Sequence, residues 1–127
     1  MSTPAATFHD LHVWQKSHAL ALRIYQATST FPKHEIFGLT QQMRRAAVSV
    51  PSNIAEGFRR RSRWDKARFL NIAAASLDEL QYQLLLAHDL NYCDSTAMRN
   101  EALEVARMLS AYERTILASA RTANQAS

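Results

Sequence analysis

Glycine and proline are almost absent from this chain, and their scarcity limits the folds open to it. Only five of the 127 residues are Gly or Pro, and three of these, Pro32, Gly38 and Pro51, lie between positions 32 and 51. An all-β protein of this length would need a turn roughly every ten residues, many with Gly or Pro. Apolar residues make up 47% and charged residues 20%, which excludes disorder over most of the chain. We therefore expect one compact, mostly helical domain.

Several kinds of protein are excluded by what the sequence lacks. Cys93 is the single cysteine, which rules out an internal disulfide framework and a zinc site built on several cysteines. No apolar run approaches the length of about 18 residues that a transmembrane helix needs. The first ten residues have neither the basic region nor the apolar core of a secretory signal. We therefore expect a soluble, cytoplasmic protein that does not enter a membrane.

Four segments carry apolar residues at the spacing of an amphipathic helix. They are residues 11–28, 39–60, 62–90 and 96–118. Asp10 is the expected N-cap of the first helix, and Ser62, with Asp65 three positions later, is the expected N-cap of the third. Pro51 lies inside the second helix, where its missing N–H predicts a kink. Two shorter helices that break at Val50 are the alternative.

Four helices joined by short loops fold most simply as an up-down-up-down bundle. The expected fold is therefore all-α: one up-down-up-down four-helix bundle over residues 8–118, with a Pro-kinked second helix. The end segments, residues 1–7 and 119–127, are expected to be flexible tails.

Two of the expected helices have more apolar surface than one core requires. In residues 11–28 the apolar side chains cover roughly 220° of the helix circumference, about twice the usual arc. In residues 62–90, the apolar residues off the core stripe are Ile72, Tyr82, Leu85 and Leu86. This surplus predicts a partner surface, and self-association is its simplest source.

The basic charge of the chain is concentrated in residues 44–68. This segment carries a net charge of +6, whereas the rest of the chain sums to −2. A local basic field attracts phosphates or an acidic protein surface. The cations expected to bind nucleic acid are Arg44, Arg45, Arg59, Arg60, Arg61, Arg63, Lys66 and Arg68. The alternative is that these arginines only solvate one helix end.

Polar side chains accompany the arginines along the second expected helix. Gln41, Ser52, Asn53 and Glu56 can bind phosphate or sugar, or they can lie at a subunit interface. In that alternative, Arg45, Asn53 and Glu56 form a network buried between subunits. Two aromatic residues, Trp64 and Phe69, flank the arginines. They can stack on unpaired bases, although a packing role at the start of the third helix is the alternative for Trp64.

Three stretches of the chain resemble a known bacterial family. Residues 8–17 read FHDLHVWQKS, residues 38–57 read GLTQQMRRAAVSVPSNIAEG, and residues 68–73 and 75–80 read RFLNIA and ASLDEL. The central stretch is the most specific. Together they resemble the bacterial four-helix-bundle family known as 23S rRNA intervening-sequence proteins, over about residues 8–118. The run Arg59–Arg61 departs from the family, whose members more often have Gly or Ser among the basic residues, and it makes the basic patch stronger here.

The resemblance implies a four-helix bundle assembled as a ring-like homopentamer. It also implies a more distant relation to the accessory protein of diversity-generating retroelements, which works with a reverse transcriptase and RNA. Most members have no established biochemical function, so the resemblance bears on fold and assembly more than on activity.

Nothing in the sequence marks a catalytic centre, a metal site or a cofactor site. His9 and His12 lack a third ligand within reach, and Cys93 lacks an oriented base. The first hypothesis is therefore a non-enzymatic RNA-binding homo-oligomer. The second is a scaffold for a protein partner, such as a nucleic-acid polymerase, with no RNA affinity of its own. The third is a small nuclease with Glu56 as its general base.

Overall fold

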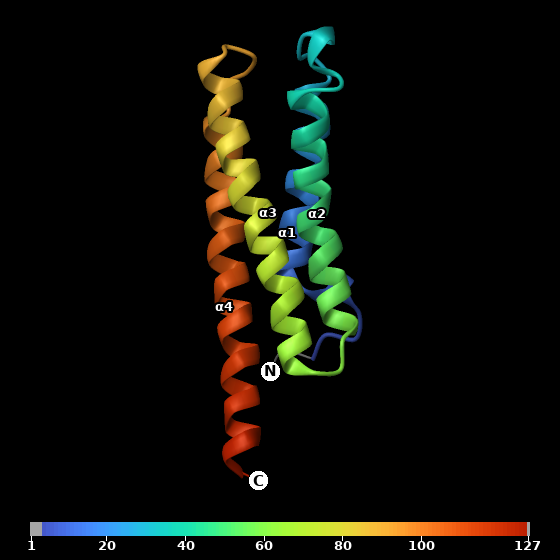
Figure 1. Cartoon of the computed structure of the whole chain (residues 1–127), viewed down its shortest axis with the longest axis vertical. Helices are drawn as coiled ribbons and strands as arrows, with labels where there is room; N and C mark the ends of the chain where they lie inside the picture. Colours follow the sequence, from blue (N-terminus) through green and yellow to red (C-terminus); the bar gives the residue numbers. More distant parts are fainter. Residues whose placement is uncertain (1–3, 127) are drawn as a thin grey trace.

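The structure of the protein is a computed structural model that describes residues 4–126, with side chains from residue 4 to residue 119. This part of the chain contains no strand. It contains η1 (Phe8–Asp10), α1 (His12–Thr28), η2 (Lys33–Glu35), α2 (Leu39–Arg59), α3 (Arg63–Asp89) and α4 (Thr96–Ala126). The four long helices alternate in direction, and each packs against its two neighbours around the bundle (Figure 1). The expected all-α four-helix bundle is confirmed.

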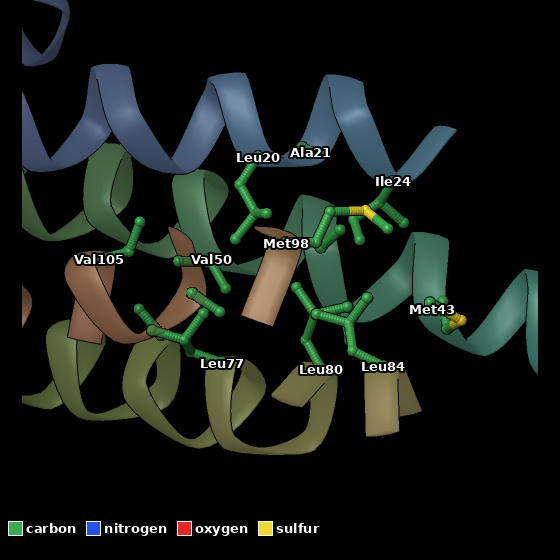
Figure 2. Packing of buried hydrophobic residues seen from close by; sticks show 14 of the residues in the cluster. Leu20, Ala21, Ile24, Met43, Val50, Leu77, Leu80, Leu84, Met98 and Val105 are labelled. Atoms are coloured by element: carbon green, nitrogen blue, oxygen red, sulfur yellow. The ribbon is translucent and has the colours of Figure 1, made fainter. Parts of the chain in front are cut away.

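The core is formed by one face of each helix, as the apolar spacing predicts. Figure 2 shows Leu20 and Ile24 of α1, Met43 of α2, Leu80 of α3 and Val105 of α4 pointing into the same interior. Each of these side chains is at most 2% exposed. Burying a side chain of this size contributes about 1.5–3 kcal/mol, so the contacts along this seam are the main source of stability.

The start of α1 differs from the prediction. Asp10 does not cap α1, whose N-cap position is Leu11 and has no side-chain hydrogen bond. The Asp10 carboxylate instead accepts hydrogen bonds from the backbone N–H groups of Ala6 (2.9 Å) and Thr7 (3.1 Å) and so closes η1. Those two bonds lower the pKa of Asp10, since they favour its charged form.

Helix α2 runs without interruption through Pro51, so the alternative of two helices that break at Val50 is wrong. Pro51 itself is buried on the side of α2 that faces α1. The kink expected at Pro51 stays a prediction.

Helices α2 and α3 share the most extensive contact in the bundle, and Gly57 permits their close approach. A Cβ atom on Gly57 would lie 3.2 Å from Cβ of Phe69 and 3.3 Å from the backbone oxygen of Lys66. The N-cap expected at Ser62 is confirmed, because its Oγ accepts a hydrogen bond from the N–H of Asp65 at 3.4 Å. These features set the sharp connection between the two helices.

Helix α4 is longer than expected. It continues to Ala126 rather than ending near Ala118, and it projects past the other helices at the end where α2 joins α3 (Figure 1). The domain bounds of 8–118 and the flexibility expected for residues 1–7 and 119–127 stay predictions, and residues 1–3 and 127 lie outside the described part. Within residues 4–126, none of the helices has the combined length and hydropathy needed to cross a bilayer.

Candidate nucleic-acid interface

The eight cations expected to form one patch fall into two groups at opposite ends of α2. Arg44 and Arg45 lie in its second turn, whereas Arg59 is its last residue. At 1.5 Å per residue, Arg45 and Arg59 are about 21 Å apart along the helix axis. The second group stands around the α2–α3 connection and is called the basic end here. It consists of Arg59, Arg60, Arg61, Arg63, Lys66 and Arg68.

The side chain of Arg44 joins α2 to α1 through hydrogen bonds. Its Nε donates to Oγ1 of Thr28 at 2.9 Å, and one of its terminal nitrogens donates to the backbone oxygen of Tyr25 at 3.3 Å. The guanidinium also lies over the Tyr25 ring, 4.7 Å from its centroid. Positive charge at the C-terminal end of a helix is favourable, so this contact stabilises the end of α1. Arg45 is exposed and has no such partner in the described chain.

Lys66 holds the C-terminal end of α2. Its Nζ donates to the backbone oxygen of Phe58 at 2.6 Å and to that of Gly57 at 3.3 Å. Burial lowers the pKa of its ammonium group, and the nearby charge of Arg63 lowers it further. The ammonium group of Lys66 therefore caps the last carbonyl groups of α2 and is not free to bind a ligand.

Arg60 and Arg68 are oriented by the same aromatic ring. Their guanidinium groups lie over Phe69 at 4.5 Å and 4.7 Å from its centroid. Arg60 also pairs with Glu56 at 3.0 Å, and Arg68 approaches Asp65 at 4.0 Å. Exposed ion pairs of this kind contribute little, so both arginines can exchange their carboxylate for another anion.

Three arginines of the basic end remain without a partner. Arg59, Arg61 and Arg63 are exposed, and none of them makes a hydrogen bond or ion pair with any residue that the structure describes. They occupy the last residue of α2, the link and the first residue of α3, within five positions of one another. The basic end thus concentrates unneutralised guanidinium groups at one end of the bundle.

Of the four polar residues expected at the site, one takes part in helix packing and three are exposed on the surface. Asn53 donates to the backbone oxygen of Ser49 (2.8 Å) and to its Oγ (3.0 Å), and that Oγ lies 2.8 Å from Oγ of Ser76 on α3. This network joins α2 to α3 within one chain. Gln41, Ser52 and Glu56 are exposed.

A groove between α1 and α2 is the main surface feature that could not be located from the sequence. It consists of two adjoining hollows of about 940 and 530 Å³, which share Tyr25 and Val48. Its walls are mostly apolar and include Leu22 at 52% and Phe37 at 88% exposed. The surplus apolar arc of residues 11–28 was the available signal. The α2 residues were not recognisable, because Val48 lies outside the core stripe of its own helix.

A second apolar surface lies between α3 and α4, and it is called the α3–α4 face here. Tyr82 and Leu85 of α3 and Leu103 of α4 are 62%, 41% and 43% exposed. They line a hollow of about 550 Å³ together with Asp78 and Arg99. Tyr82 and Leu85, which were expected off the core stripe, are exposed, whereas Leu86 is partly buried and packs against the core.

Two of the candidate catalytic and metal-binding residues, His9 and Glu56, line one hollow of about 630 Å³ together with Arg59, but no hydrogen bond joins them. Cys93 lies apart from them, in the connection between α3 and α4. The described residues contain no group of three or more His, Cys, Asp and Glu side chains suited to a metal ion. Burial raises the pKa of the Cys93 thiol, and Asp94 raises it further, which disfavours the thiolate form. The ring of His88 contacts the segment just before α4, because its Nδ1 accepts a hydrogen bond from the N–H of Ser95 at 3.3 Å.

Fold and surface together define a small four-helix-bundle protein with one strongly cationic end and two exposed apolar faces. The chain belongs to the 23S rRNA-intervening sequence protein family, whose model matches residues 9–111. This confirms the family resemblance, while the relation to the retroelement accessory protein stays a prediction.

A solved structure from Bacteroides thetaiotaomicron, described as a protein of unknown function from the S23 ribosomal protein family, is similar to the chain. The two are 26% identical and superpose with a TM-score of 0.74, over 80% of this chain and 95% of the other. A search of curated proteins found no match.

Proposed function

We propose that this protein is a cytoplasmic, non-enzymatic oligomer that binds RNA phosphates through the basic end. The main support for this proposal is a cluster of three exposed arginines, Arg59, Arg61 and Arg63, which pair with no carboxylate in the described part of the chain. The family is described by its link to intervening sequences of 23S rRNA, which makes RNA the first ligand to test.

Phosphate binding suits the chemistry of the basic end. A guanidinium group is always charged and presents a planar fork of donors that matches two phosphate oxygens. Arg60 and Arg68 can join the three free arginines, because their ion pairs to Glu56 and Asp65 are exposed and weak. Contacts of this type position a nucleic acid without reading its sequence.

The decisive experiment compares two double variants of equal charge. Arg61→Glu/Arg63→Glu alters the basic end, and Arg107→Glu/Arg114→Glu alters exposed positions of α4. Binding of a 20-nucleotide single-stranded RNA is measured between about 50 and 200 mM salt, where phosphate contacts dominate the salt dependence. Circular dichroism checks that both variants keep the fold.

We expect the wild-type affinity to fall steeply with salt. Loss of two phosphate contacts should weaken binding and reduce the slope of log affinity against log salt by about 1.4 in the first variant only. Equal effects of the two variants would mean that net charge alone attracts the RNA. Binding that is absent or indifferent to salt would overturn the proposal and favour a scaffold for a protein partner.

The oligomer is proposed to form by docking the α3–α4 face of one chain into the α1–α2 groove of the next. Both surfaces are apolar, and they belong to different pairs of neighbouring helices. Lys33, Arg44 and Arg45 make the groove basic, whereas Asp78 and Arg99 balance each other in the hollow of the α3–α4 face, so apolar packing is the proposed basis of this contact. A head-to-tail contact of this type closes into a ring when its rotation allows, and the family resemblance implies five subunits.

Two single variants test this arrangement. Val48→Asp places a charge in the groove and Leu85→Asp places one on the α3–α4 face; both residues are 41% exposed, so the monomer fold should survive. Light scattering should show that each variant alone is monomeric, whereas a mixture of the two forms a 1:1 dimer through the remaining intact pair of surfaces. Ala19→Asp, on an exposed position of α1 that lines neither surface, is the control. If Leu85→Asp alone keeps the wild-type mass, the head-to-tail contact is refuted.

A further inference from the structure

Trp64 is an aromatic side chain that the fold leaves uncovered. It is the second residue of α3, 53% of it is exposed, and it has no ring partner among the described residues. The other tryptophan, Trp14, is half-buried and packs against the rings of Phe8 and His18, each 5.0 Å away between centroids. Trp64 is therefore the exposed tryptophan, and it stands within the basic end.

The other aromatic residues of this end are already covered by cations. Arg60 and Arg68 lie over the ring of Phe69. Phe58 is half-buried, and Nζ of Lys66 lies 5.4 Å from its ring centroid. Of the two stacking candidates that the sequence suggested, Phe69 is thus occupied and Trp64 is open.

The surroundings of Trp64 match what an unpaired nucleotide requires. Arg61 and Arg63 lie three positions and one position before it, both exposed and without a partner among the described residues. Arg68 and Asn71 follow at four and seven positions, which places them on the same outward side of α3. An open ring, several guanidinium groups and an exposed amide therefore occur on one continuous surface.

We propose that Trp64 stacks on an unpaired base, so that the basic end binds single-stranded or looped nucleic acid in preference to a perfect duplex. This inference rests on the proposed function. In a duplex every base is already stacked between its neighbours, so a duplex offers the basic end only phosphates and sugars. A strand with free bases offers the same phosphates and also a ring for Trp64.

The first test measures strand preference. Affinities for a 20-nucleotide single-stranded RNA and for a blunt RNA duplex of equal length are compared at one salt concentration. Trp64→Leu should weaken single-strand binding about five- to 150-fold and leave duplex binding unchanged, because one stacked base is lost. Trp64→Phe should restore part of the loss. Leu90→Ala is the control, since Leu90 is an exposed apolar residue at the opposite end of α3 that lines neither apolar surface.

The second test observes the ring itself. The chain has two tryptophans, so in a Trp14→Phe variant the emission comes from Trp64 alone. Single-stranded RNA should quench this emission. Inorganic polyphosphate, which has the charge of a nucleic-acid backbone but no bases, should bind without quenching it.

The outcomes separate this inference from the proposed function. If Trp64→Leu keeps the wild-type preference while Arg61→Glu/Arg63→Glu still loses binding, phosphate binding stands and the stacking role of Trp64 is wrong. If polyphosphate quenches Trp64 as strongly as RNA does, stacking is also refuted. If neither RNA binds the wild-type protein, both the function and the inference fall.

Discussion

Substitution of Lys66 by methionine separates the cation that supports the fold from the cations that are free to bind. Methionine keeps most of the length of the side chain and removes its ammonium group. The two hydrogen bonds to the backbone oxygens of Phe58 and Gly57 are then lost, at the C-terminal end of α2 where positive charge is favourable.

The size of the effect follows from these contacts. A hydrogen bond with a charged donor contributes about 1.5–3 kcal/mol, but water can replace part of it at a helix end. Burial of the ammonium also opposes the gain, since it lowers the pKa of Lys66. We therefore expect Lys66→Met to lower the free energy of unfolding by about 1.5 kcal/mol in total. For a domain of this size that loss corresponds to a fall in Tm of about 4–8 °C.

The assay is thermal unfolding followed by circular dichroism, at one protein concentration because oligomers unfold in a concentration-dependent way. Arg63→Met is the matched control: it removes one positive charge three residues away, from a side chain without a partner. Its Tm should stay within about 2 °C of the wild type, while its RNA affinity should fall more than that of Lys66→Met. Equal Tm shifts for the two variants would refute the assignment of Lys66 to the helix end.

Three further predictions concern the fold. Oη of Tyr92 donates a hydrogen bond to Glu35 at 2.8 Å and lowers the pKa of that carboxyl group, so the stabilising effect of this bond is present above about pH 4.5 and is lost as the pH falls. The Tm difference between wild type and Tyr92→Phe should therefore shrink between pH 6 and pH 3. A constant difference would contradict this. Gly57→Val should lower stability by more than about 2 kcal/mol, measured by urea unfolding, because its Cβ would meet Phe69 at 3.2 Å. Leu80→Ala should cost about 2–5 kcal/mol in the same assay, since Leu80 is completely buried, and a loss below 1 kcal/mol would show that the core had collapsed around the gap.

Much of the fold could be predicted because its signals are local. The periodic apolar stripes located four helices, and the spacing from Ser62 to Asp65 located the start of α3. Asp10 failed as a cap of α1 because its carboxylate is used by two earlier N–H groups, a choice that the residue type does not reveal.

The individual roles of the basic residues could be predicted only in part. The charge run at residues 59–68 indicated an anion-binding end, and its composition is visible without any structure. Which cation is free depends on tertiary contacts: Arg44 reaches α1, and Lys66 reaches back to the last carbonyls of α2. The groove escaped prediction for the same reason, because Tyr25 and Val48 come from different helices.

The three-residue link between α2 and α3 also has a consequence for the order in which the chain folds. Closing so short a loop costs little entropy, and the two helices that it joins share the largest contact in the molecule. Local contacts of this kind form early in folding. We therefore expect the α2–α3 hairpin to dominate the transition state, so that Ile54→Val slows refolding, whereas Val105→Ala in α4 mainly accelerates unfolding. The arginines would then converge on one end while α1 and α4 are still undocked.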